Sequence, residues 1–150
     1  MNFPAFLASF LLATSALFSA ETAQPELPVT TLRIGQTSIR AEVADEDPER
    51  AAGLMFRESL APGSGMLFVM PTVGPASFWM RNTPLPLSIA FLDEAGAIME
   101  IHDLQPKSEK IVRSMFPRVA YALEMPQGWF GKNNIWPGER VTGLPARPRN

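Results

Sequence analysis

Residues 87–104 have the sequence LSIAFL-DEAGA-IMEIHDL, in which two apolar runs flank a short polar segment. The runs Leu87–Leu92 and Ile98–Leu104 are each long enough for a strand, and they bracket Asp93-Glu94-Ala95-Gly96. A glycine-containing polar segment between two such runs is typical of a β-hairpin. This stretch therefore predicts a pair of antiparallel strands in the core of the protein.

The same alternation of apolar runs and turn residues extends in both directions. Leu32–Ile34 and Ser38–Val43 flank Gly35-Gln36, which predicts a second hairpin. Three further apolar runs predict strands, and a fourth strand is expected near Val141. The three runs are Met66–Met70, which Pro71 is expected to end, Ala76–Met80 and Val119–Met125.

Helix signals are short. Asp47-Pro48-Glu49-Arg50 predicts a helix start with Asp47 as the N-cap, and we expect that helix to continue through Met55. Gly128–Asn133 predicts a second short helix, with Asn134 in a left-handed turn at its end. Pro137-Gly138 suits the two central positions of a type II turn.

These elements predict a single α+β domain over residues 30–145. Its mostly antiparallel β-sheet is expected to close into a small barrel, with one or two short helices. The chain of 150 residues is long enough to bury one core unaided, and its 15 prolines argue against long helices. Residues 146–150 form a basic tail that we expect to be frayed.

The first twenty residues carry no ionisable side chain and are dominated by Phe, Leu and Ala. An apolar run of this size followed by small residues predicts a secretory signal peptide over residues 1–20, cleaved after Ala16 or Ala20. Residues 21–29 then form an extended leader. The prediction places the mature protein in the periplasm or outside the cell, and the alternative is a protein anchored to the membrane by its uncleaved N-terminus.

Composition excludes several function classes. A net charge of −2 gives no field that would recruit nucleic acid. The absence of cysteine removes disulfides, thiol nucleophiles, zinc fingers and iron–sulfur clusters together. Met66 and Met70 offer thioethers that suit Cu(I), but the chain has one histidine, so we expect both to pack in the core. No metal or cofactor is expected.

Four ordered motifs resemble one known family. They are Gly53-Leu54-Met55-Phe56-Arg57, Gly65-Met66-Leu67-Phe68, the run from Phe78 to Leu92 that contains Arg81-Asn82-Thr83-Pro84, and Tyr121-Ala122-Leu123-Glu124-Met125-Pro126 followed by Gly128-Trp129-Phe130 and Gly138-Glu139-Arg140-Val141. In this order they resemble domain of unknown function 192, a family of small prokaryotic domains that are often exported. The resemblance implies a compact β-rich fold with one or two short helices, and it implies no particular activity or substrate.

The segment Trp79–Thr83 is the best candidate for a binding site. It lies at the end of a predicted strand, because two prolines follow it closely. Arg81, Asn82 and Thr83 combine a positive charge, an amide and a hydroxyl beside the ring of Trp79, which suits a polar ligand. The alternative is structural, with Asn82 and Thr83 hydrogen-bonded to the backbone of a turn and Trp79 filling the core.

Two acids are further candidates. Asp103 ends a predicted strand, and Arg81 is its natural partner if its face is buried. A general base there would be Asp103 or His102, but neighbouring residues of a strand point to opposite faces. Glu124 lies on the strand face opposite Tyr121, either as a ligand-binding residue or as a solvated or structurally paired carboxylate.

The sequence thus favours a monomeric, non-enzymatic module that binds a polar ligand, such as a carbohydrate or an envelope component. The candidate site residues are Trp79, Arg81, Asn82, Thr83, Asp103 and Glu124. One alternative is a small hydrolase or transferase that uses Asp103 or Glu124 for acid/base chemistry. The other is a purely structural domain without a small-molecule ligand.

Cleavage of the predicted signal peptide is directly measurable. Expressed in full length in a bacterium, the protein should be recovered from the periplasm or medium with Leu17 or Glu21 as its first residue. Intact-mass spectrometry of the purified protein distinguishes the two starts. A mature mass that still includes Met1 would contradict the prediction.

Overall fold

The computed structural model describes residues 22–147, so the predicted signal peptide and residues 148–150 lie outside the described part. Strands dominate this part, in the order β1 (Val29–Ile34), β2 (Thr37–Ala44), α1 (Asp47–Ala52), β3 (Ser64–Gly74), β4 (Ser77–Phe78), β5 (Leu87–Leu92), β6 (Ile98–Leu104), β7 (Val112–Arg113), β8 (Val119–Pro126), α2 (Trp129–Lys132) and β9 (Val141–Thr142). Within residues 22–147, no helix has the length and apolar character needed to cross a bilayer.

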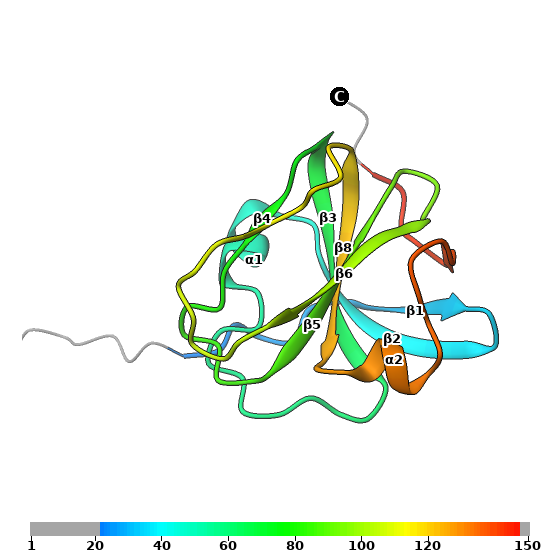
Figure 1. Cartoon of the computed structure of the whole chain (residues 1–150). Coiled ribbons are helices and arrows are strands. Elements are labelled where there is room, and N and C mark those ends of the chain that lie inside the picture. The colour runs from blue at the N-terminus through cyan, green and yellow to red at the C-terminus, as the bar shows by residue number, and fades with distance from the viewer. Residues whose placement is uncertain (1–21, 148–150) are drawn as a thin grey trace, which may run out of the picture.

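Seven strands form one strongly curled sheet in the order β6-β5-β8-β3-β2-β1-β9 (Figure 1). Neighbours are antiparallel except β2 and β3, which run parallel because α1 lies in the connection between them. β4 and β7 pair separately as a two-residue ribbon. The α+β class and the antiparallel majority are therefore as predicted, and so are the hairpins β1–β2 and β5–β6.

The sheet does not close into the barrel that the sequence predicts. Its two outer strands, β6 and β9, meet at a single bridge between Ala97 and Arg140, supported by hydrogen bonds such as Ile98 N to Glu139 O at 2.8 Å. The reason is the length of β9, whose two residues already pair with Arg33 and Ile34 of β1. Such a short strand cannot also form a ladder with β6, and the sheet remains a half-barrel.

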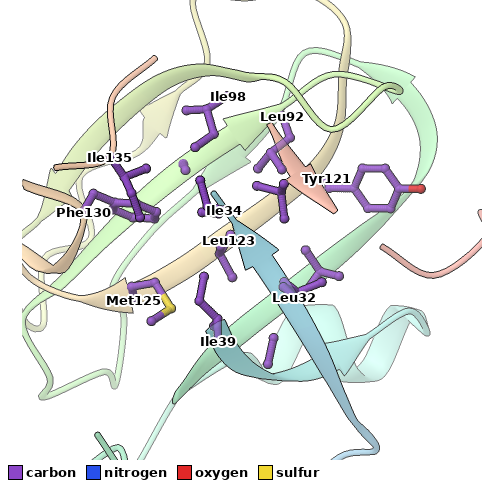
Figure 2. Packing of buried hydrophobic residues seen from close by; sticks show 14 of the residues in the cluster. Leu32, Ile34, Ile39, Leu92, Ile98, Tyr121, Leu123, Met125, Phe130 and Ile135 are labelled. Atoms are coloured by element: carbon purple, nitrogen blue, oxygen red, sulfur yellow. The ribbon is translucent and has the colours of Figure 1, made fainter. Parts of the chain in front are cut away.

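The concave sheet encloses the first of two apolar cores (Figure 2). Leu32, Ile34 and Ile39 enter it from the first hairpin, and Leu123 and Met125 enter it from β8. Phe130 after the start of α2 and Ile135 beyond its end close one side. Tyr121, Leu123 and Met125 share this face of β8, as their spacing predicts.

A second core lies on the other face of the central strands. Met66 and Phe68 of β3, Ile89 and Phe91 of β5 and Ala122 of β8 belong to it. It is covered by α1 with its following turn, by β4 and by the segment after β6, and Figure 1 shows α1 and β4 on the opposite side of β3 and β8 from α2. All six residues of β5 and seven of the eight in β8 are consequently buried.

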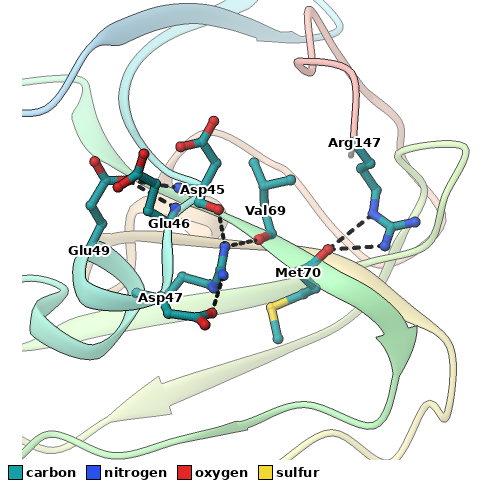
Figure 3. Close-up of polar contacts among 8 residues, drawn as sticks. Asp45, Glu46, Asp47, Glu49, Val69, Met70 and Arg147 are labelled. Atoms are coloured by element: carbon teal, nitrogen blue, oxygen red, sulfur yellow. Dashed lines mark hydrogen bonds and ion pairs between the residues drawn. The ribbon is translucent and has the colours of Figure 1, made fainter. Parts of the chain in front are cut away.

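Helix α1 differs from its prediction at both ends. Its N-cap is Glu46 rather than Asp47, and the Glu49 carboxylate accepts the backbone N–H of Glu46 at 3.1 Å (Figure 3). The helix ends at Ala52, before the predicted Met55, because Gly53 adopts a φ of 48°. A left-handed glycine terminates helices, and the chain then turns to bury Leu54 in the second core.

Strand β3 continues past Pro71, where it was expected to end. Its pairing with β8 is irregular between Val69 and Gly74, and a proline is tolerated in such a stretch. Two arginines bind carbonyls there: Arg50 donates to Val69 O at 2.9 Å and Arg147 to Met70 O at 3.0 Å (Figure 3). The basic tail is thus attached to β3 at Arg147.

Gly65 of β3 lies where β3 and β8 approach each other closely. A Cβ at this residue would overlap the Glu124 carbonyl oxygen and the Met125 sulfur, whereas a Cβ at Gly74 would meet nothing within 4 Å. We expect Gly65→Ala to destabilise the fold by about 3 kcal/mol or more, since backbone cannot move aside. Gly74→Ala is the matched control and should change stability by less than about 0.5 kcal/mol. Urea unfolding of both variants measures the difference, and equal effects would contradict the packing described.

Candidate functional site

Two turns lie together over the second face of the sheet, one following α1 and one following β4. The Phe56 N–H donates to the Asn82 carbonyl at 2.8 Å, and the Lys107 N–H donates to the Thr83 carbonyl at 2.9 Å. Phe56, Asn82 and Lys107 all have positive φ, at 60°, 54° and 58°. Left-handed residues other than glycine are uncommon and concentrate at sites where the surrounding structure holds them for a function.

The segment Trp79–Thr83 is a turn here, because β4 contains only Ser77 and Phe78 of the predicted Ala76–Met80 strand. The Thr83 hydroxyl is buried and donates to the Arg81 carbonyl at 3.1 Å. Trp79 is 43% exposed, and the Arg81 guanidinium carbon lies 5.6 Å from the centroid of its ring. Thr83 therefore serves the turn, while Trp79 and Arg81 form a stacked pair at the surface.

Glu124 comes close to this turn from β8. Its register partners are Met66 of β3 and Ile89 of β5, so its side chain shares their face of the sheet. Only 4% of the residue is exposed. Glu124 lines a cavity of about 30 Å³, the Glu124 cavity, together with Ala51, Ala52, Gly53, Leu54, Met55, Phe68, Phe78, Trp79 and Thr83. The fold thus brings together three of the predicted site residues, Trp79, Thr83 and Glu124.

Every one of the four sequence motifs contributes to this cavity. Gly53–Met55 come from the first motif, Phe68 from the second, Phe78 with Trp79 and Thr83 from the third, and Glu124 from the fourth. The aliphatic and phenyl members were not predicted as site residues. In the sequence, these residues stood out only because they belong to a motif. Membership of a motif does not by itself distinguish a core residue from a site residue.

The Glu124 carboxyl has an unusual electrostatic environment. Within residues 22–147 no hydrogen bond or ion pair engages it, and every other residue that lines the cavity is uncharged. Burial in these surroundings raises the pKa of Glu124 to about 8. At neutral pH the group is mostly a neutral carboxylic acid, able to donate one hydrogen bond, and an opposite charge in the cavity would ionise it.

A larger depression borders the same two turns. The Asn82 groove has a volume of about 820 Å³ and is lined by Thr22, Ala23, Phe56, Glu58, Asn82, Pro84, Lys107 and Glu109. It includes all three of the left-handed residues named above. Asn82 therefore faces the groove, while its neighbour Thr83 lines the Glu124 cavity.

Asp103 lies elsewhere, and the burial on which its pairing with Arg81 depended is not found. Asp103 is exposed and accepts a hydrogen bond from the Ser88 hydroxyl at 2.6 Å. Ser88 is its register partner on β5, and the Ser88 oxygen also accepts the N–H of Gly128 at 2.9 Å. The acid thus supports the start of α2.

Glu100 is a buried acid that the sequence reasoning did not select. Its carboxylate binds His102 Nε2 at 2.6 Å, the Phe116 N–H at 2.8 Å and the Met115 N–H at 3.2 Å. Burial alone would raise the pKa of Glu100, but these backbone and histidine contacts outweigh it, and the pKa is lowered. His102 therefore has a structural partner, and the pair fastens the segment after β6 to that strand.

The raised pKa of Glu124 predicts that the stability of the fold decreases as pH rises. Below about pH 4.5, its ordinary pKa, both folded and unfolded chains hold the proton; between 4.5 and about 8 only the folded chain does. The contribution of protonated Glu124 to stability is therefore complete at low pH and is lost as pH rises toward 8. We expect the free energy of unfolding of the wild type to fall by about 1.4 kcal/mol per pH unit between pH 5 and 8, relative to that of Glu124→Gln. Urea unfolding at each pH measures this, and parallel curves would contradict an unpartnered buried carboxyl.

Comparisons with known proteins agree with this architecture. A family model matches residues 30–143, that of DUF192, described as "Uncharacterized ACR, COG1430". A protein from Sinorhizobium meliloti 1021, provisionally assigned as a transcription regulator, is 34% identical to this chain in sequence. Its crystal structure matches with a TM-score of 0.76, and the match covers 80% of this chain and 97% of that one. A protein of unknown function from Novosphingobium aromaticivorans DSM 12444 is 31% identical, with a TM-score of 0.73 over 83% and 93%. No curated protein matches the chain in sequence. The chain belongs to the DUF192 family.

Proposed function

We propose that this protein is an exported, non-enzymatic module that binds a polar ligand at the Glu124 cavity and the Asn82 groove, which border the same two turns. The observation that carries the proposal is the Glu124 carboxyl, which is buried beside a cavity and has no partner within residues 22–147. Unpaired buried carboxyls are costly, and an apolar residue of similar volume would remove that cost. A ligand that supplies the missing partner would offset the cost of burying this carboxyl.

The Asn82 groove supports the proposal by its size and polarity. Its volume of about 820 Å³ lies in the range of small-molecule sites, roughly 300–1,000 Å³. Glu58, Asn82, Lys107 and Glu109 give its lining both signs of charge and an amide. We propose that the body of the ligand lies in this groove, where a saccharide or an envelope fragment has room. Three residues with positive φ, Phe56 and Asn82 of the two turns and Lys107 after β6, would hold the groove in shape.

Export is supported by the apolar, charge-free run over residues 1–20. The absence of cysteine is compatible with an oxidising compartment, because the fold depends on its two cores and not on thiols. We therefore place the ligand among molecules of the periplasm or the medium. We propose that the mature protein acts as a monomer.

The raised pKa of Glu124 favours one second candidate, a small acid/base hydrolase or transferase. A carboxyl that titrates near pH 8 is suited to donate or accept a proton at neutral pH. Glu124 has no second ionisable group beside it in the cavity, and Asp103 is bound to Ser88. Catalysis would need a second functional group beside Glu124, whereas binding needs only the ligand. The site therefore favours binding.

A thermal-shift screen tests the binding proposal. The mature protein, Glu124→Gln and the surface control Glu94→Gln are screened against amines, alcohols, sugars and envelope fragments. Glu94 is half exposed and pairs with Arg118 outside the site. A ligand at 100 times its Kd stabilises by about 2.7 kcal/mol, which should raise the melting temperature of the wild type by several degrees. We expect Glu124→Gln to lose most of this shift and Glu94→Gln to keep it.

Three results would point elsewhere. Turnover of a screened compound that Glu124→Gln abolishes would favour the enzyme. A flat screen, together with melting temperatures that change with Glu124→Gln alone, would favour the structural domain without a ligand. A shift that survives Glu124→Gln unchanged would place the binding site outside the cavity.

A further inference from the structure

The size of the Glu124 cavity limits what can enter it. A volume of about 30 Å³ compares with roughly 10–15 Å³ for the space that holds one water molecule. The cavity therefore admits a terminal group of one or two heavy atoms and excludes a sugar ring or a trimethylammonium group. Whatever the rest of the ligand is, its end must be small.

The polar side chains of the cavity are suited to accept hydrogen bonds. The Thr83 hydroxyl uses its proton on the Arg81 carbonyl, which leaves only lone pairs for a ligand. The Glu124 carboxyl, once ionised, is an acceptor with two oxygens. An ammonium group carries three donors and no acceptor, so it matches Thr83 and the ionised Glu124 carboxylate. A carboxylate or phosphate could accept only the single proton of the neutral Glu124 acid and has nothing to donate to Thr83.

Aromatic rings form much of the remaining lining. Phe68 and Phe78 meet edge to face, with ring centroids 5.0 Å apart, and Trp79 lies beside them in the lining. Aromatic faces attract cations, most strongly that of tryptophan. Trp79 already carries one cation on its ring, the guanidinium of Arg81, at the protein surface. The lining thus combines three aromatic rings with Glu124.

Among the described residues 22–147, no charged side chain other than Glu124 lines the cavity. Within residues 22–147, Glu124 is the one charged side chain of β3, β5 and β8, and Tyr121, the other titratable residue of these strands, lies on the opposite face in the first core. Glu100 and His102 of β6 share the sheet face of Glu124 but bind each other at 2.6 Å, and no charged residue of β6, of α1 or of the two turns lines the cavity. The basic ones all have other partners: Arg50 binds Val69 O and Asp47, Arg57 binds Glu42 at 3.0 Å, and Arg81 stacks on Trp79. The acids of α1, Asp47 and Glu49, belong to its first turn.

We propose that the Glu124 cavity binds the protonated primary amine at the end of a ligand, with the ammonium between the Glu124 carboxylate and Thr83 and against the rings of Phe68, Phe78 and Trp79. The inference rests on the proposed binding function and names its ligand class, an aminated compound with an unbranched amine end. The amine supplies the charge and the donors that the protein leaves out around Glu124.

Binding of an ammonium is coupled to loss of the Glu124 proton. Burial keeps the free carboxyl protonated up to about pH 8, and the ligand's charge favours the ionised form. Below that pH each bound amine therefore releases one proton, and affinity should rise about tenfold per pH unit between pH 6 and 8. Above pH 8 the affinity should level off until the amine itself, with a pKa near 10, loses its charge.

Three probes of equal length test the inference: n-butylamine, 1-butanol and butyrate. Each is titrated into the protein while the indole N–H signals of the tryptophans are followed by NMR, with Trp79→Phe used to assign the Trp79 signal. Trp136, which is 59% exposed and outside the cavity, is the internal control. We expect butylamine alone to shift the Trp79 signal, with a Kd at least tenfold lower at pH 8 than at pH 6. Glu124→Gln should abolish this binding, and Thr83→Val should weaken it several-fold.

The outcomes separate this inference from the proposed function. Butanol binding that depends on Glu124, without butylamine binding, overturns the amine and leaves a site for neutral polar ligands. Butylamine binding that is independent of pH between 6 and 8 overturns it as well, even if Glu124→Gln fails to fold. A Trp79 signal unmoved by all three probes, in a protein whose melting temperature no screened compound raises, overturns the inference and the proposed function together.

Discussion

Burial of both faces of β3, β5 and β8 is the constraint on which the rest of the structure depends. One face packs into the concave core of the curled sheet, and the other needs a separate cover. The chain supplies that cover from short pieces: α1, the turns after α1 and β4, and the segment held to β6 by Glu100. Because these pieces are irregular, they leave small spaces between themselves and the sheet, and the Glu124 cavity is one of them.

The same constraint gives Glu124 its chemical character. A carboxyl on an outer strand of a half-covered sheet would be solvated and would titrate near its ordinary pKa. On β8, between Met66 and Ile89, only 4% of the residue is exposed, and no hydrogen bond or ion pair engages its carboxyl within residues 22–147. Its raised pKa follows from this desolvation, and so does its capacity to respond to a ligand by releasing a proton.

The turns that cover Glu124 also shape the Asn82 groove. Phe56 and Asn82 are joined through their backbones, and so are Thr83 and Lys107, in conformations that need φ above zero at three non-glycine residues. The cost of these conformations is met by the burial of Leu54 and Met80 beside them. The two turns thus contribute residues to both the cavity and the groove.

Several features were predictable from the sequence because they depend on neighbours along the chain. The hairpins β1–β2 and β5–β6, the capped start near Asp47 and the turn at Pro137-Gly138 follow from local turn chemistry and apolar periodicity. The choice of Trp79, Thr83 and Glu124 as candidate site residues was also made from the sequence, and the fold brings these three to one cavity. The resemblance of the motifs to the DUF192 family rested on the same local order.

Other features were decided only when distant segments met. Asp103 bonds Ser88 rather than Arg81 because the register of β5 and β6 places those two residues opposite each other. The sheet does not close into a barrel because both residues of β9 already pair with β1. The sequence by itself determined most of the strands and turns and which polar residues stand among apolar ones, but neither the extent of β3 and β4 nor the presence of β7. Only the tertiary structure decided that Glu124 has no hydrogen-bond or ion-pair partner within residues 22–147, because this depends on every element packed against it.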